Sequence, residues 1–160
     1  MLYFVAEAYC FGNGVDTDLE KGINYLNQAY NFGNGKAANL LGTCYSKGLG
    51  VEKNLNRAFE LYEEAVNRGS VHAFGNIGVH YLRGWGCQAY ADKASATFVK
   101  GAEEGEPFAA LYLAKCLETG IGNNGKPDLK AAQRWYVEAA KNGNEGALSW
   151  CRENGVKLQS

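Results

Sequence analysis

The chain lacks an excess of charge of either sign: 16 lysines and arginines stand against 17 aspartates and glutamates, for a net charge of −1. Nucleic acids and anionic membranes select strongly basic surfaces, so we expect neither as a partner. No apolar run approaches the roughly 18 residues that a membrane span needs. The start, MLYFVAEAYC, has no basic segment before a long apolar core, and it indicates a helix and not a signal peptide.

Paired cysteines and N-x-[ST] glycosylation acceptors are lacking too. The number of cysteines is odd, and they are not spaced in pairs: Cys10, Cys44, Cys87, Cys116 and Cys151. Reduced, buried thiols in a cytoplasmic protein are therefore expected. Either Met1 is the true start or the chain is a segment of a longer array, and a leader removed before residue 1 is also compatible with the sequence.

Glycine, by contrast, is abundant: the chain has 21, about twice the average usage of ~7%. Twelve of them recur in three columns at a step of 36 residues, with a last step of 38 in the third column. We expect helix ends with positive φ at these positions. The columns are Gly12, Gly48, Gly84 and Gly120; Gly14, Gly50, Gly86 and Gly122; and Gly33, Gly69, Gly105 and Gly143.

A fixed period of a few tens of residues is typical of solenoids built from repeated helix pairs. Small residues in a fourth column, Gly42 and Gly78 with Ala6 and Ala114, predict close approach between neighbouring helices. Apolar spacings of three and four predict the helices themselves. They are expected at Leu2–Phe11, from Asp18 to before Gly33, Lys36–Lys47, Asn54–Arg68, His72–Arg83, Ala91–Glu104, Phe108–Thr119, Asp128–Asn142 and Glu145–Glu153.

Helix-start signals differ between the repeats. Asp18, Asn54 and Asp128 are expected to cap the second helix of the first, second and fourth repeats. The third repeat has the turn GWGCQAY and no capping residue, so its second helix should begin weakly. Pro107 is expected in the first turn of its helix, where a missing N–H costs little.

The motif A-x3-L-G-x2-Y-x2-G-x-G-V, followed by K-A-x3-Y-x2-A-x3-G, resembles the Sel1-like repeat, a longer relative of the tetratricopeptide repeat. The second copy matches nearly throughout, and the third departs most, with Cys87, Tyr90 and Gly101 at motif positions. The resemblance implies an all-α fold: a right-handed α-solenoid of antiparallel helix pairs in one domain. It has about four repeats of 36–38 residues and a C-terminal capping helix, at residues 1–34, 35–70, 71–106, 107–144 and 145–160.

Two patterns look like chemical sites and are better explained by the repeats. GIGNNGKP, residues 120–127, is close to a phosphate-binding loop, but a helix precedes it and Pro127 replaces the hydroxyl residue that holds magnesium. Cys44, His80 and Cys116 share one column, yet stacked helices lie about 10 Å apart, too far for one zinc ion. We therefore expect no metal, no cofactor and no catalytic residues.

The tetratricopeptide relation implies a partner-binding groove on the concave side, lined by first-helix residues outside the packing columns. Apolar residues beside basic ones are typical of a protein-binding surface. The predicted groove residues are Phe11, Lys36, Asn39, Thr43, Lys47, His72, Val79, Arg83, Phe108, Leu111 and Lys115. Trp85, between two glycines, is a second candidate: it either anchors a partner or folds back over its own repeat.

These features favour a non-catalytic scaffold or adaptor that binds another protein or peptide. The alternative is an immunity protein that neutralises a secreted bacterial toxin, a use that the resemblance also implies. An enzyme built on the repeat is a third class, for which the sequence offers no residues. Neither the identity of the partner nor the oligomeric state follows from the sequence.

Overall fold

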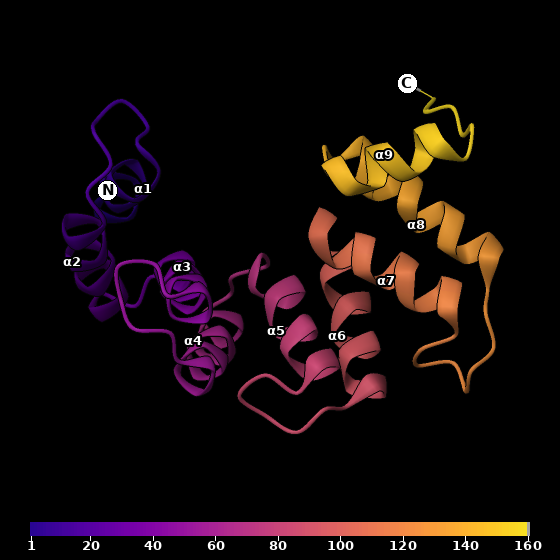
Figure 1. Cartoon of the computed structure of the whole chain (residues 1–160), viewed down its shortest axis with the longest axis horizontal. Helices are drawn as coiled ribbons and strands as arrows, with labels where there is room; N and C mark the ends of the chain where they lie inside the picture. The colour runs from indigo at the N-terminus through magenta and orange to yellow at the C-terminus, as the bar shows by residue number, and fades with distance from the viewer. Residues whose placement is uncertain (160) are drawn as a thin grey trace. The chain divides into compact units, whose positions relative to one another are not determined.

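The computed structural model describes residues 1–159, and within them the chain forms nine α-helices and no β-strand (Figure 1). This confirms the predicted all-α fold. The helices are α1 Leu2–Phe11, α2 Leu19–Asn31, α3 Gly35–Lys47, α4 Leu55–Asn67, α5 Ala73–Arg83, α6 Ala91–Glu103, α7 Pro107–Thr119, α8 Leu129–Lys141 and α9 Glu145–Glu153.

The predicted caps begin the second helices. The side chain of Asp18 accepts a hydrogen bond from the Lys21 amide, and Asn54 and Asp128 cap α4 and α8 in the same way. An amide at the start of a helix has no partner within the helix, and these oxygens supply one. Tyr90, before α6, makes no such side-chain bond, which agrees with the missing capping residue predicted for the third repeat.

Glycine ends the first helices and the connecting turns. All twelve glycines of the three columns have positive φ, which confirms the prediction. At the end of α3, for example, Gly48 has φ 71° and its amide donates to the carbonyl of Cys44. A left-handed residue at this place closes the last turn, and a side chain there would be strained.

Two compact units make up the chain, and the first contains α1 to α4 together with Trp85–Cys87. The pairs α1–α2 and α3–α4 pack as hairpins, and α2 packs on α3 (Figure 1). Leu26, Leu41 and Leu61 are buried at the centre. A Cβ at Gly42 would lie 2.7 Å from the ring of Tyr62, so this small-residue column does allow the close approach that was predicted.

Gly50, in the turn of the second repeat, lets that turn approach the second helix of the first repeat closely. A Cβ at Gly50 would lie 3.0–3.3 Å from atoms of Leu19 and Ile23, in the first turns of α2. Gly14, its counterpart in the first repeat, has nothing within 4 Å of that position. The same glycine column therefore shapes the turn alone in the first repeat, and shapes the turn and allows packing on the preceding helix in the second.

The second unit contains Phe74–Gly84 and, among the described residues, 88–159. The ring of Phe98 on α6 lies against Gly78 of α5 and stacks on Tyr112 of α7 at 5.3 Å. Tyr136 of α8 stacks on Trp150 of α9 at 4.1 Å. The last helix thus covers apolar side chains of α8, the role expected of the C-terminal capping helix.

None of the described helices combines the length and the apolar character that crossing a membrane requires.

Candidate functional site

The predicted groove residues of the first unit lie on or beside first helices. Phe11 at the end of α1 is 54% exposed, and Lys36, Lys47 and His72 are exposed as well. Asn39 and Thr43 are half-buried on α3. The Thr43 hydroxyl donates to the carbonyl of Asn39 and lies 3.2 Å from the hydroxyl of Tyr62, so Thr43 contributes to packing within its own helix pair.

A cleft of about 490 Å³ in the first unit brings two of these residues together. Lys36 and His72 line it with Tyr3, Phe4 and Arg68. Phe4 is 65% exposed, so the cleft combines an accessible aromatic ring with basic side chains. Such a mixture suits a peptide that offers both apolar and acidic groups. We refer to this site as the first-helix cleft.

Ser70 lies in the wall of the first-helix cleft. Its side chain is buried, and its hydroxyl oxygen has no hydrogen-bond partner among the described residues. In the same column of the preceding repeat, Asn34 caps α3 by accepting from the Ala37 amide at 2.9 Å. Ser70 makes no such bond, and α5 begins only at Ala73. A buried hydroxyl without a partner costs folding free energy, because the water it has lost is not replaced by another hydrogen-bond partner.

In the second unit the predicted basic residues are exposed and the predicted apolar ones mostly are not. Arg83 and Lys115 are exposed, but Val79 and Leu111 are each only 7% exposed. Leu111 lies beneath α9, where a Cβ at Gly146 would be 3.2 Å from it. These two apolar residues therefore offer almost no surface to a partner.

Phe108 is also used internally. It is half-buried, its ring lies against Gly75 of α5, and it meets Tyr112 edge-on at 4.9 Å. The prediction took Phe108 for a surface residue because it lies outside the packing columns of the repeat. It packs because Gly75 leaves room for a large ring that an alanine or larger residue would exclude.

Trp85 belongs to the loop segment that the contacts assign to the first unit. Its side chain is 37% exposed. The next residue, Gly86, lies so close to the carbonyl of Leu55 at the start of α4 that a Cβ would overlap it. The loop that carries Trp85 is thus held on the preceding second helix, which limits how far the indole can move.

The cysteines are reduced, and four of the five are buried; Cys87 is half-buried. Burial raises the pKa of the Cys44 and Cys116 thiols to about 11, because the interior disfavours the thiolate. Over residues 1–159, no disulfide joins any of them, and no group of three or more His, Cys, Asp or Glu side chains is placed to hold a metal ion.

A second cleft, of about 820 Å³, was not found by sequence reasoning. It lies in the second unit and is lined by residues of α6 and α8 and by Ala110 near the start of α7. Ala102, Ala110, Arg134, Trp135 and Glu138 are among its lining residues. The sequence signal was available: the column of Ala102 holds Tyr30 and Val66 in the first two repeats, so a large side chain is missing there. We refer to this site as the second-helix cleft.

The repeat pattern matches a family model described as the Sel1 repeat at residues 1–34, 35–70 and 107–144. The unmatched third repeat is the one whose motif departs most. By sequence, no curated protein is a match.

Solved structures share the fold. A Sel1 repeat protein from Oxalobacter formigenes is similar over 99% of this chain, with TM-score 0.86 and 28% identity; the chain covers 64% of it. A protective antigen of uropathogenic Escherichia coli with an SLR fold is similar over 97%, with TM-score 0.74 and 26% identity, and 33% of it is covered.

The cysteine-rich protein B of Helicobacter pylori has the same fold, with TM-score 0.62 and 21% identity over 83% of this chain and 97% of that one. This chain therefore spans less than two thirds of the Oxalobacter and Escherichia proteins. The phased glycine columns, the helix pairs and the three matched repeats together lead to one conclusion: the chain belongs to the Sel1 repeat family.

Proposed function

We propose that this chain binds another protein or peptide through the exposed residues of its first helices, as a scaffold or adaptor. Sel1 repeat proteins generally act as protein-interaction scaffolds, and the fold is typically non-catalytic. The observation that carries the proposal is the first-helix cleft, which holds Phe4, Lys36 and His72 together. The binding residues proposed are Phe4, Phe11, Lys36, Lys47 and His72 in the first unit, and Arg83 and Lys115 in the second.

The charge of the proposed binding residues indicates the chemistry of the partner. Among the named residues every charged side chain is basic, although the whole chain has a net charge of −1. Acidic side chains on the partner would steer its encounter and fix its register, while apolar side chains meeting Phe4 and Phe11 would supply most of the binding energy. An acidic segment with one or two apolar anchors fits this surface best.

The experiment is affinity capture from the native source, followed by mass spectrometry. The wild type is compared with the double variant Lys47→Glu and Arg83→Glu, which reverses one basic residue in each unit. The matched control is Lys21→Glu with Lys100→Glu, which makes the same charge change at exposed positions of α2 and α6. We expect a partner captured by the wild type and the control but lost from the double variant.

If the double variant keeps its helical circular dichroism and still captures the same partner, the first-helix surface is not the binding surface. The immunity-protein alternative has no observation of its own in the structure and stays a prediction. The same capture tests it, because a secreted toxin would then be the protein recovered.

A further inference from the structure

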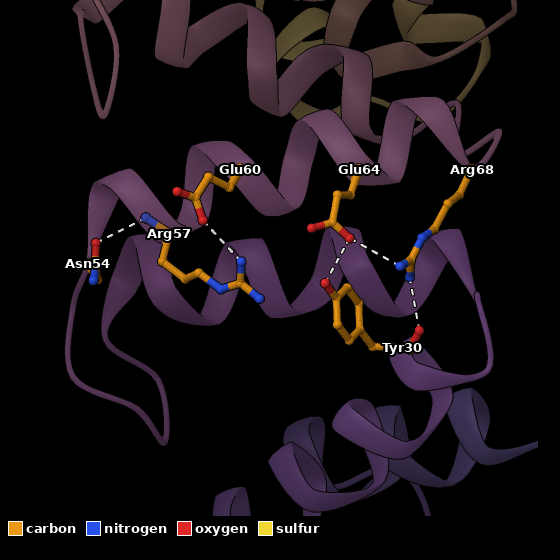
Figure 2. A network of polar contacts seen from close by, with 6 residues as sticks. All are labelled: Tyr30, Asn54, Arg57, Glu60, Glu64 and Arg68. Atoms are coloured by element: carbon orange, nitrogen blue, oxygen red, sulfur yellow. Dashed lines mark hydrogen bonds and ion pairs between the residues drawn. The ribbon is translucent and has the colours of Figure 1, made fainter.

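The second helices of the two units can be compared residue by residue. Corresponding positions lie 72 residues apart before the loop at 120–128 and 74 apart after it. In the first unit, Tyr30 of α2 packs on Ala38 and the small residues around it. Its hydroxyl donates a 2.7 Å hydrogen bond to Glu64 of α4. Figure 2 shows this bond joining the two second helices.

Arg68 completes that arrangement. Its guanidinium lies 4.4 Å from the centre of the Tyr30 ring and donates to the Tyr30 carbonyl at 2.9 Å and to Glu64 at 3.0 Å. Tyr30 thus has small apolar residues packed against it, a cation at its ring and a carboxylate at its hydroxyl. Figure 2 shows the Arg68 and Glu64 side chains beside it.

In the second unit the tyrosine is missing, and Asn142 stands at the position of Arg68, so the cation is missing as well; the alanine and the glutamate are retained. Ala102 stands at the position of Tyr30, Ala110 at that of Ala38, and Glu138 at that of Glu64. All three line the second-helix cleft. The cleft therefore lies at the position that a tyrosine ring fills in the first unit, and the carboxylate that would accept its hydroxyl is still present.

The lining of the second-helix cleft can also accommodate an aromatic side chain and its hydroxyl. Trp135 lines the cleft where the first unit has Leu61, and its indole provides an aromatic wall. Glu138 forms an exposed ion pair with Lys141 at 3.7 Å, which occupies one of its oxygens. A carboxylate offers about four acceptor positions, so it can also accept from a phenol.

We propose that the second-helix cleft receives a tyrosine side chain of a partner protein, with its hydroxyl donating to Glu138 and its ring against Ala110 and Trp135. This rests on the proposed scaffold function and adds an anchor point on the opposite helices of the repeat. The chain's own Tyr30 is the template, because the first unit holds that side chain with the same alanine and glutamate positions.

The probe is p-cresol, the isolated tyrosine side chain. Its binding to the full ¹⁵N-labelled chain is followed by the indole N–H signals of Trp85, Trp135 and Trp150, assigned with single Trp→Phe variants. A small phenol in such a cleft should bind with a Kd on the order of 1–10 mM. We expect the Trp135 signal to shift with saturation, and the other two to move much less.

Toluene and Glu138→Gln test the hydroxyl contact. Toluene has the ring without the donor, and a hydrogen bond to a charged acceptor should make p-cresol bind about tenfold more tightly. Glu138→Gln should weaken p-cresol several-fold and leave toluene unchanged. Unchanged toluene binding also shows that the variant is folded.

Ala102→Tyr tests whether the second-helix cleft is the space for a tyrosine ring, because the variant fills that cleft with a tyrosine of the chain itself. It should abolish the p-cresol shift, whereas Ala96→Tyr, at an exposed position of the same helix, should leave it intact. A Trp135 signal that does not respond overturns the inference, as does equal binding of toluene and p-cresol. A dimer that Ala102→Tyr dissociates also overturns it, because the guest would then be a second copy.

Failure of p-cresol binding leaves the scaffold function standing, because partner capture through the first helices is measured separately. Loss of a captured partner on Ala102→Tyr but not on Ala96→Tyr supports both.

Discussion

At the scale of single residues, the repeat places the same residue type in different environments. The turn glycines show this most clearly: Gly14 and Gly50 share a column and a positive φ, at 81° and 69°. Only Gly50 meets a preceding second helix. The positive φ is a local requirement that repeats with the sequence, whereas the packing requirement depends on which helix lies against the glycine: α2 lies against Gly50.

Alanine substitution separates the two requirements. Gly14→Ala should cost about 1–2 kcal/mol, the strain of a left-handed alanine. Gly50→Ala should cost more by roughly 1 kcal/mol or above, because its Cβ also presses on Leu19 and Ile23. Urea unfolding measures both values. Equal losses in the two variants would show that the inter-repeat contact contributes nothing.

Tyr62 supplies a pH prediction at the same scale. Burial raises its pKa to about 12, mainly by desolvation, so the folded state favours the neutral phenol. The resulting stability is complete below pH 10, the ordinary pKa, and is lost as the pH rises toward 12. Tyr62→Phe should reduce the fall in unfolding free energy by about 1.4 kcal/mol per pH unit in this window.

Urea unfolding at pH 9, 10, 11 and 12 provides the measurement. Tyr3 and Tyr136 also have raised pKa values, so part of the alkaline loss should remain in the variant. An unchanged slope in Tyr62→Phe would mean that the Tyr62 phenol is not protected in the folded state.

At the scale of elements, the helix starts explain where the repeat is regular and where it is not. Asn34, Ser70, Glu106 and Asn144 share one column, and all but Ser70 accept a bond from the third amide of the following helix. A serine is an ordinary capping residue, so the sequence gives no warning of this difference. The position of the serine hydroxyl relative to the chain that follows it decides the outcome.

Two alanine variants test this reading of the column. Asn34→Ala removes a working cap and should cost about 1 kcal/mol, or 2–4 °C in Tm for a domain of this size. Ser70→Ala removes a buried hydroxyl without a partner and should be neutral or slightly stabilising. Differential scanning calorimetry decides; a loss of Tm in Ser70→Ala as large as in Asn34→Ala would contradict the assignment.

At the scale of the molecule, the reduced thiols report on the packing of both units. Cys10 and Cys44 are buried in the first unit, Cys116 and Cys151 in the second, and Cys87 is half-buried. A thiolate must form and meet its reagent before it reacts, and burial hinders both steps.

Ellman's reagent at pH 8 should therefore label one thiol quickly and the other four only as the units unfold. Cys87→Ser should remove the fast phase without changing the slow one. Fast labelling of two or more thiols in the native protein would show that at least one unit opens more readily than its packing indicates.

How much could be predicted from the sequence differs between fold and site. Helix ends were predictable because caps and left-handed glycines are local features, and α1 was bounded as observed. The exposure of Leu111 and Phe108 was not, since Leu111 lies against α9 and Phe108 against Gly75, each more than 30 residues away in the sequence. Val79 is buried too. Trp135 was missed because it lines a cleft that exists only where a large side chain is absent, at Ala102. A search for recurring residues does not detect a residue that is absent.

The sequence alone therefore determined the family, the helix pairs and the turns, because each depends on residues within one repeat and is written several times. Only the tertiary structure decided which residues face solvent and where hollows lie. These depend on single departures from the repeat, such as Ala102 in place of a tyrosine, and on the neighbouring helices that those departures leave uncovered.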